Sequence, residues 1–536
     1  MPFRPIQWAR QTIEGRQIEA DGSRLLNFYA VQLAAPDESK VPVMIYSSPG
    51  QRRWMRTNGG EARAGDRPGV HALLELDSVI YGHWLFGITH QSVFFAIRAD
   101  PENSGSHNID RAYNPFGGAV YQIPEESTWR FTSETQEITP RDQPRKLVTD
   151  GRRVLFVSPS EVYAFDLKRL RDGESNPFAQ VVAPVPADLS TLADLQEQDW
   201  VDCLWIDGYF LLAAKSGQFF HSNLDSLQFD QLDFAEAGAN PDSIVGIETL
   251  HRRVYIFGDR SIEGWYNAGL ADFAFARDNS STLNVGCAAR ATIAADQFSI
   301  SFLGNDGIVY ALLGGAPIRI SSESVEYDIS ESNPSLARGV VYTEEGHRFY
   351  LLTLIYDNGN RKAWGYDFST GVWHERSQTN ILCMARWRKR QNLVGREGAA
   401  HIFDMRLNWG TMENDQAGEA PIFREAVSPL VFANLQRFKM RQFLIDIPVR
   451  SDGLDEDEIL IEWSDDGKNI WKGGYSWVRD ENGNRKKNSK KLKAGQRHRV
   501  HRMGQAYVGR HIRITTDAKR RVDILGAYVE TDVAPD

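Results

Sequence analysis

The residue types that most often perform catalysis are present in this 536-residue chain, but not at spacings that build a known catalytic motif. A Gly-x-Ser-x-Gly elbow, which exposes a nucleophilic serine, does not occur. A Gly-x-x-x-x-Gly-Lys phosphate loop and a His-Glu-x-x-His zinc helix are also missing. The dispersed carboxylates and arginines offer many pairings and favour none. We therefore expect a protein that is not an enzyme and has no catalytic residues, metal or cofactor.

Histidine and cysteine side chains lie in hydrophobic, strand-like segments without a common ligand spacing. Such histidines are more often structural than metal ligands. Three widely separated cysteines favour small core residues over a disulfide framework or catalytic thiols. The residues concerned are His83, His90, His221, His347, His374, His401, Cys203, Cys287 and Cys383.

The segment SDDGKNIW (residues 464–471) resembles the Asp-box of sialidase-like propellers. In those proteins Ser and Asp hydrogen-bond a hairpin turn while Trp packs beneath it, so the box is structural and not catalytic. It occurs once here, whereas sialidases repeat it. A carbohydrate-active propeller, either a glycosidase or a lectin, is therefore an alternative. It predicts a deep central pocket with facing carboxylates about 5 to 9 Å apart.

Positive charge is concentrated near the C-terminus, although the formal net charge of the chain is −10. Residues 481–521 hold 14 Lys and Arg against 2 Asp and Glu, so the rest of the chain carries −22. Such a block suits a solvated face, an acidic protein partner or a nucleic-acid backbone. Few aromatic residues are interleaved with the cations before Tyr507, which argues against a surface on which bases stack.

A unit that recurs six times between residues 152 and 405 supplies the framework for these residues. Each copy has an apolar β-rich run, a tight polar turn, and a second β-rich run that contains aromatic residues. After the first interval the spacing is roughly 45 residues, as in propeller blades of four antiparallel strands. An all-β chain with a β-propeller of about six blades is expected, with an irregular β-sandwich as the alternative. The first runs are centred near Leu155, Phe210, Ile256, Phe302, Leu351 and Val394.

Three regions follow from this organisation. Residues 1–64 form an extended N-terminal segment that packs with the C-terminal domain, and residues 65–415 hold the propeller. Residues 79–98 are expected to be an additional or closing hairpin, and residues 125–145 an excursion from the disc. The polar stretch 411–421 has the composition of a linker. Residues 416–536 form a C-terminal β-sandwich platform. Helix is scarce, and residues 187–198 are the best candidate.

Three patches of sequence resemble the packaged-DNA stabilisation proteins of short-tailed bacteriophages, also called tail hub or nozzle proteins. The first joins LLNFYAVQLAAPDES to YSSPGQRRW, and the second is VGIETLHRRVYIFGDRSIEGWYNAG. The third pairs IEWSDDGKNIWKGG with VHRMGQAYVGRHIRITTDAKRRVDILGAYVE. The patches occur in the family's order over nearly the whole chain. This sequence is longer between residues 98 and 150 and before the last domain.

The resemblance implies a structural virion protein made in the host bacterial cytoplasm. Family members form a hexameric ring below the portal and its adaptor, close the exit channel after packaging and conduct double-stranded DNA during ejection. Tail fibres, tailspikes and a tail needle are further expected partners, and no membrane insertion is expected. An acidic bore would let DNA slide, because a cationic one would hold it through many phosphate contacts.

Two sets of residues are candidates for this role. The basic stretch is expected to face the acidic underside of the adaptor ring. Loops at residues 98–118 and 272–286 are expected to gate the channel, in the second case through Phe273, Phe275, Arg277, Asp278 and Asn279. The adaptor-interface candidates are Arg485, Lys486, Lys487, Lys490, Lys491, Lys493, Arg497, Arg499 and Arg502. A third class, a cytoplasmic scaffold propeller that binds peptides, predicts a monomer.

Overall fold

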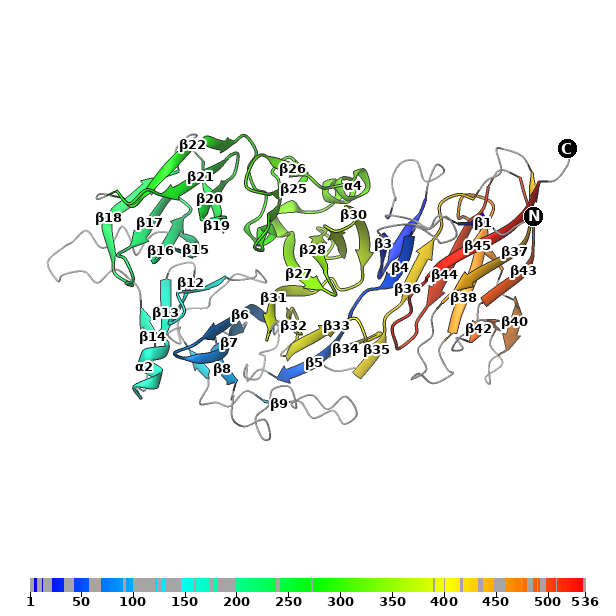
Figure 1. Cartoon of the computed structure of the whole chain (residues 1–536), viewed down its shortest axis with the longest axis horizontal. Coiled ribbons are helices and arrows are strands. Elements are labelled where there is room, and N and C mark those ends of the chain that lie inside the picture. The colour runs from blue at the N-terminus through cyan, green and yellow to red at the C-terminus, as the bar shows by residue number, and fades with distance from the viewer. Residues whose placement is uncertain are drawn as a thin grey trace.

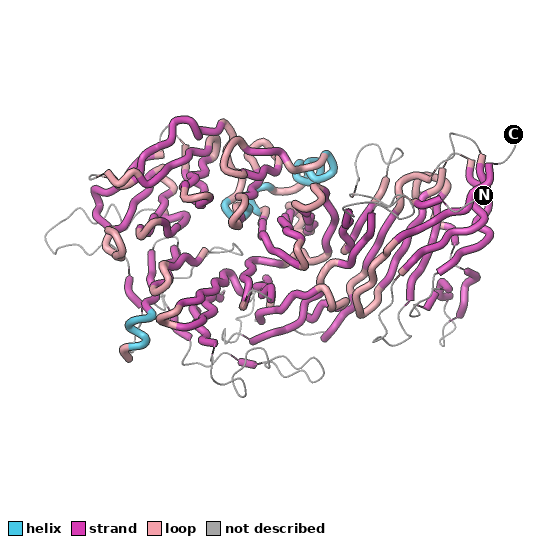
Figure 2. The backbone as a smooth tube through the Cα atoms, in the orientation of Figure 1, coloured by secondary structure: helices cyan, strands magenta, loops and turns pink. Residues whose placement is uncertain are grey.

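Strands make up nearly all of the regular structure in the computed structural model (Figure 2), which confirms the all-β expectation. The helices α2 (Leu167–Arg171) and α4 (Glu323–Glu331) and the 3₁₀ turns η3 (Arg290–Thr292) and η4 (Pro334–Leu336) lie in connections between strands. The structure describes residues 4–6, 12, 22–32, 43–56, 69–89, 93–99, 121–122, 128–130, 146–158, 161–173, 178–180, 199–237, 242–270, 273–388, 391–399, 401–414, 418–431, 437–447, 458–473, 475–479, 485–488, 490–491, 498–507 and 509–533.

Seven four-stranded antiparallel units follow one another along the described chain (Figure 1). The first three are β6 (Val70–Ser78), β7 (Gly82–Thr89), β8 (Val93–Ala99) and β10 (Thr128–Arg130); β11 (Leu147–Thr149), β12 (Arg153–Ser158), β13 (Glu161–Asp166) and β14 (Phe178–Gln180); and β15 (Trp200–Ile206), β16 (Tyr209–Ala214), β17 (Gln218–Ser222) and β18 (Phe229–Glu236). The fourth and fifth are β19 (Ile244–Leu250), β20 (Arg253–Gly258), β21 (Ile262–Asn267) and β22 (Phe275–Leu283); and β23 (Ala294–Ala295), β24 (Ile300–Leu303), β25 (Val309–Leu312) and β26 (Pro317–Arg319).

The sixth unit is β27 (Arg338–Glu344), β28 (His347–Ile355), β29 (Arg361–Asp367) and β30 (Val372–Arg376). The seventh joins β31 (Ile381–Trp387), β32 (Gln391–Arg396) and β33 (His401–Arg406) to the N-terminal strand β5 (Gly50–Arg56), which β9 (Tyr121–Gln122) also contacts. The propeller is thus confirmed, and the described ring has seven units where about six were expected.

The ring closes through contacts between the first strands of neighbouring units. These contacts run in the order β6, β11, β15, β19, β23, β27, β31 and back to β6. Each unit is packed between its neighbours, so its middle strands are largely buried. In β28 every residue from Phe349 to Ile355 is buried. Continuous burial of this kind, and not a two-residue alternation, explains the apolar runs of the sequence.

The polar turns sit between the second and third strands of the units, as the repeat predicts. Gly217, Gly307 and Gly359 have φ of +97°, +80° and +81°. Glycine is favoured there because its lack of a Cβ permits positive φ in a tight hairpin. The six runs predicted from the repeat correspond to β12, β16, β20, β24, β28 and β32.

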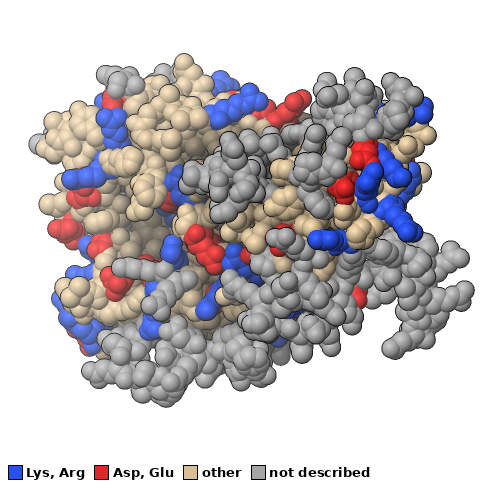
Figure 3. All heavy atoms as spheres, turned by 45° about the vertical axis from the view of Figure 1, so that its right-hand side comes forward, with Lys and Arg blue, Asp and Glu red and all other residues tan. Residues whose placement is uncertain are grey.

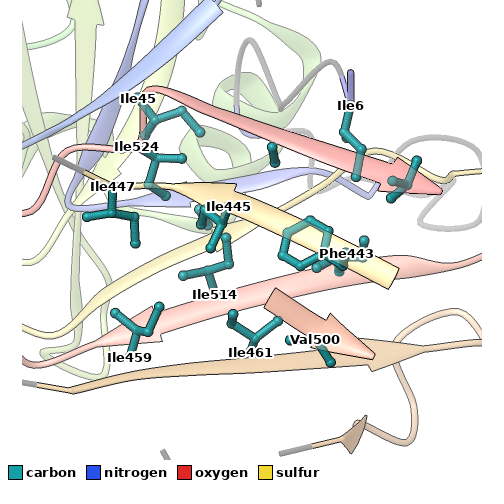
Figure 4. Packing of buried hydrophobic residues seen from close by; sticks show 14 of the residues in the cluster. Ile6, Ile45, Phe443, Ile445, Ile447, Ile459, Ile461, Val500, Ile514 and Ile524 are labelled. Atoms are coloured by element: carbon teal, nitrogen blue, oxygen red, sulfur yellow. The ribbon is translucent and has the colours of Figure 1, made fainter. Parts of the chain in front are cut away.

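A two-layered β structure follows the ring. One layer is β1 (Arg4–Pro5), β45 (Gly526–Val533), β37 (Phe438–Asp446) and β43 (His498–Ala506), in that order. The other contains β36 (Arg424–Val427), β44 (His511–Thr516), β38 (Glu458–Ser464), β39 (Lys472–Gly473) and β42 (Lys490–Lys491). Phe443 and Ile445 from the first layer face Ile461 and Ile514 from the second in a shared apolar core (Figure 4). Burial of these side chains is the main force that holds the layers together.

N-terminal strands connect the ring to this sandwich. The strand β2 (Arg24–Leu26) pairs in parallel with β30 of the sixth unit and antiparallel with β36, so one ten-stranded sheet spans both parts. The hairpin of β3 (Phe28–Gln32) and β4 (Val43–Ser47) lies beside it, and Ile45 bridges to Ile524. Burial of Ile6, Leu25 and Ile45 places this segment in the sandwich core. The domain limits at residues 64 and 415 stay predictions.

Two local expectations differ from the structure. Residues 411–421, expected as a linker, form a hairpin of β34 (Thr411–Asn414) and β35 (Gly418–Pro421), and β34 pairs with β5. Within the expected excursion, β10 completes the first unit by pairing with β8. The hairpin expected at residues 79–98 is confirmed, because β7 pairs with β8, and it belongs to that unit. The helix candidate at residues 187–198 lies outside the described residues.

Candidate partner-binding surface

A basic face on the outer layer of the sandwich is the best-defined candidate site. The pairing of β37 with β43 places exposed cations from two distant stretches of sequence on one surface. Buried and exposed residues alternate on these strands, so the buried set packs into the core while the cations point outward. We call this surface the basic face; it consists of Arg437, Lys439, Arg441, Arg499, His501 and Arg502.

A bulge in both strands shapes the basic face. Met440 pairs with Gly504, but the next pair is Gln442 with His501, so the register shifts between them. Arg441 and Arg502 lie in this irregular stretch. Arg502 has φ of +59°, a left-handed conformation that is uncommon for a side chain other than glycine. Bulges turn side chains away from the regular pleat, and here two arginines are displayed in this way.

Carboxylates and an aromatic ring border the basic face. Arg441 forms an ion pair with Asp532 of β45, and Gln442 donates to the Glu530 carboxylate at 2.5 Å. The Arg437 guanidinium lies 4.7 Å from the centre of the exposed Tyr507 ring. Figure 3 shows Lys and Arg atoms gathered beside Asp and Glu atoms at this end of the molecule. The surface can therefore bind a partner through both charge and apolar contact.

The structure brings together only part of the predicted adaptor-interface set. Arg485, Lys486 and Lys487 lie in β41 (Arg485–Asn488), which pairs with β40 (Tyr475–Arg479). Lys490 and Lys491 form β42, which pairs with β38. Arg499 and Arg502 belong to the basic face on β43. Lys493 and Arg497 lie outside the described residues.

Sequence reasoning named only Arg499 and Arg502 of the basic face. Arg437, Lys439 and Arg441 lie about 60 residues before their strand partners, outside the block in which positive charge is concentrated. The signal that could have found them is the alternation of cations with Phe438 and Met440, which is typical of a half-buried strand.

The predicted gate residues are held in a strand at the outer edge of the fourth unit. Residues 275–283 form β22, so the expectation of a loop there is wrong. Phe275 is buried, and the Ala274 N–H donates to His221 Nε2 at 3.2 Å. Arg277 forms an ion pair with Glu263 at 3.0 Å, and Phe273 packs on His221. Asp278 pairs with Arg253 at 2.9 Å. This anchoring opposes a swinging motion, because many contacts would have to break together.

Two further gate expectations are not tested by the structure. The side chain of Asn279 and residues 100–118 lie outside the described parts of the chain. Their role at a channel stays a prediction.

The Asp-box-like turn has the internal hydrogen bonds expected of a structural motif. Ser464 Oγ donates to Asp466 Oδ1 at 2.6 Å and accepts from the Lys468 N–H at 3.0 Å. The Ile470 N–H donates to Asp466 Oδ1 at 3.0 Å. These bonds lower the pKa of the Asp466 carboxyl. The carboxylate is thus used to close the turn.

Carboxylates inside the ring are also paired with cations. Arg290 donates to Asp202 Oδ1 at 2.8 Å, and the Lys146 ammonium lies 2.9 Å from the Glu248 carboxylate. Burial opposes ionisation of Asp202, but Arg290 and Lys146 outweigh it and lower the pKa of that carboxyl. These ion pairs join residues from different units of the ring, so they stabilise it.

The cysteines and most of the histidines lie where the sequence suggested. All three thiols are free and buried, and burial raises the pKa of Cys203 and Cys287 to about 12. His347 contacts the Asp367 carboxylate at 2.8 Å, and His83 contacts Glu75 at 2.6 Å. His221, His374 and His401 are buried, and His90 lies outside the described residues.

No group of side chains suited to a metal ion occurs among the described residues. In the same part of the chain, no helix is long and apolar enough to cross a membrane.

Comparison with known proteins identifies one matching family. The family model described as "Bacteriophage P22 Gp10, beta-propeller" matches residues 111–402, which is more than half of the chain. No curated protein sequence matches. Among solved structures, the chain is similar to the computationally designed Ika8 protein, with 7% identity over 66% of this chain and 99% of that one and a TM-score of 0.37. It is also similar to BamB from Moraxella catarrhalis, with 8% identity over 70% and 96% of the two chains and a TM-score of 0.36.

Proposed function

The chain belongs to the phage family of Gp10-type β-propeller proteins, which are structural components of the virion, and we propose that it forms the nozzle ring of a short-tailed phage. The ring, of six copies, lies below the portal adaptor. It closes the exit channel after packaging and conducts DNA during ejection.

The match to the family over residues 111–402 is the observation that carries this proposal. The architecture supports it. A closed propeller has no long exposed sheet edge, and the ten-stranded sheet ties the propeller to the sandwich through backbone pairing. Such a subunit can bear pressure from packaged DNA without relying on a flexible linker.

The uneven charge also supports a conduit. Outside residues 481–521 the chain carries −22, so surfaces exposed to DNA would repel its phosphates. A conduit needs this repulsion because each phosphate held by a cation adds to the affinity and slows passage. The positive charge is gathered on the sandwich, where it suits an acidic protein partner.

We assign the adaptor contact to the lysine-rich strands β41 and β42. Reversing Lys486, Lys487, Lys490 and Lys491 to Glu should weaken binding to a purified portal–adaptor complex at least tenfold. The affinity of the unchanged chain should fall as salt is raised, because screening weakens contacts between exposed charges. Binding is measured by surface plasmon resonance at two ionic strengths.

A matched control carries the same change of charge on the propeller. Lys215, Arg252, Arg260 and Arg319 are exposed there and lie in the third to fifth units. Reversal of these four to Glu should leave adaptor binding within about twofold of the unchanged chain. Equal loss of binding in the two variants would show a general effect of net charge and contradict the assignment.

A further inference from the structure

The end of the propeller farthest from the sandwich carries exposed apolar and acidic side chains in one short stretch of sequence (Figure 1). Leu232 of β18 is 77% exposed, Leu224 in the preceding turn 59% and Phe234 36%. The same stretch holds the exposed Asp225, Asp230 and Glu236 and the half-buried Asp233. We call this surface the acidic rim; it consists of Leu224, Leu232, Phe234, Asp225, Asp230, Asp233 and Glu236.

An irregular stretch of β18 exposes these side chains to solvent. Phe234 pairs with Phe220 and Phe229 with Ser222, so residues 230–233 bulge out of the sheet. Asp230 Oδ1 accepts from the Leu232 N–H at 2.9 Å and holds the bend. An exposed leucine on such a bend contributes nothing to the core, which Phe229 fills from the same strand. A single exposed apolar residue is ordinary, but three within residues 224–234, on and beside a fixed bend, indicate a contact surface.

Charge identifies what would cover the acidic rim. Residues 200–236 contain six Asp and Glu against one Lys, so a partner should be basic. The basic face offers Arg437, Lys439, Arg441, Arg499 and Arg502, and the Arg437 guanidinium lies against the exposed ring of Tyr507. Tyrosine and arginine are the residue types that most often supply binding energy in protein interfaces. The two surfaces therefore match both in charge and in apolar content.

The two surfaces cannot meet within one molecule. β18 and β43 lie at opposite ends of its long axis (Figure 1). We propose that the acidic rim of one copy docks on the basic face of a second copy. The contact is head-to-tail, because it joins two different surfaces of the same chain, and repetition of such a contact gives a ring when the rotation closes. Contact between two acidic rims is disfavoured, since like charges would face each other.

This inference rests on the proposed function in one respect: the contact between copies would build the proposed ring. The adaptor contact is assigned to β41 and β42, which are separate from the basic face, so either assignment can fail alone.

Charge exchange between the two surfaces tests the proposal. One variant carries Asp233→Arg and Glu236→Arg, which leaves Asp230 and its bond to the Leu232 N–H in place. The other variant carries Arg437→Glu, Lys439→Glu and Arg441→Glu. Each full-length variant alone should need at least tenfold higher concentration than the unchanged chain to assemble, as measured by light scattering with size exclusion. An equimolar mixture should assemble again, because every reversed surface then meets a complementary one.

Folding and specificity are controlled in the same experiment. The circular dichroism spectrum and melting temperature of both charge-reversal variants should match those of the unchanged chain. A control variant with Asp306→Arg and Asp357→Arg, in turns of the fifth and sixth units, should assemble normally. An unchanged chain that stays monomeric at every concentration overturns the inference, and so does a mixture that fails to assemble. Rim variants that assemble normally but fail to enter particles would assign the acidic rim to another tail protein and also overturn it. An unchanged chain that assembles but does not bind the purified portal–adaptor complex would instead count against the proposed function.

Discussion

At the scale of single residues, Glu344 is the carboxyl group whose environment most clearly opposes its charge. It lies at the end of β27, where Asn392 Nδ2 donates to its carboxylate at 2.6 Å. Burial, followed by the nearby Glu345 and Asp404 carboxylates, raises its pKa to about 7, although the Leu407 N–H acts in the opposite direction. The folded protein therefore binds this proton more tightly than the unfolded chain does.

This shift predicts how stability depends on pH. A raised carboxyl pKa contributes stability below the unfolded value of 4.5, and the contribution is lost as pH rises through about 7. Between pH 5 and pH 8 the free energy of unfolding of the unchanged chain should fall. The Glu344→Gln variant lacks this proton, so its fall should be smaller by on the order of 1–2 kcal/mol. Urea unfolding followed by tryptophan fluorescence at both pH values measures this difference. Parallel pH profiles for the two chains would contradict it.

Residue types predicted much of the interior but not the site. The hydrophobic surroundings of Cys203 and Cys287 indicated core residues, because local sequence carries that information. The basic face could not be read in this way. Arg437 and Arg499 become neighbours only through the pairing of β37 with β43, which is set by the fold and not by their separation in sequence.

At the scale of elements, a row of alternating charges crosses the seam between propeller and sandwich. Arg24 of β2 donates to Glu375 of β30 at 2.7 and 2.9 Å and to Glu425 of β36 at 3.0 Å. Arg513 of β44 continues the row, at 3.8 Å from Glu425 and 2.5 Å from Glu462 of β38. Five adjacent strands are thus linked by side chains as well as by their backbones.

Removal of Arg24 should weaken this seam. In Arg24→Ala the largely buried Glu375 and Glu425 lose their shared cation. The free energy of unfolding should drop by about 2 kcal/mol. This loss is smaller than that for a fully buried pair, because Arg24 is partly exposed. Arg441→Ala, which removes a cation from a more exposed pair, should cost less than about 1 kcal/mol. Urea unfolding measures both variants. Equal losses would contradict a special role for the seam.

The repeat predicted six of the units because each has an apolar run in its second strand followed by a tight polar turn. The first unit was recognised only as a hairpin, since its outer strand β10 has three residues and lies far along the chain from β8. Closure of the seventh unit by β5 could not be predicted either. Its partner β33 lies about 350 residues away, and no local pattern specifies such a pairing.

At the scale of the whole molecule, the shared sheet predicts that propeller and sandwich move as one body. Spin labels at Ser216→Cys in the third unit and Ile470→Cys in the sandwich should give a single narrow distance distribution by double electron–electron resonance. The native thiols should not react, because they are buried. The same labels in Arg24→Ala should give a broader distribution. A broad distribution in the chain that retains Arg24 would contradict the one-body arrangement.

The pairing of β2 with β30 also makes the mechanical strength of the subunit depend on direction. Leu26 and Glu375 form the one described parallel pair there, and the Asn27 N–H adds a bond to the Glu375 carbonyl at 2.9 Å. Backbone hydrogen bonds run across a sheet, so a force along the strands strains these links simultaneously. A force that pulls the sandwich sideways from the propeller would stretch the few links directly and peel them apart. Thrust from emerging DNA would therefore be tolerated best when it acts parallel to β2.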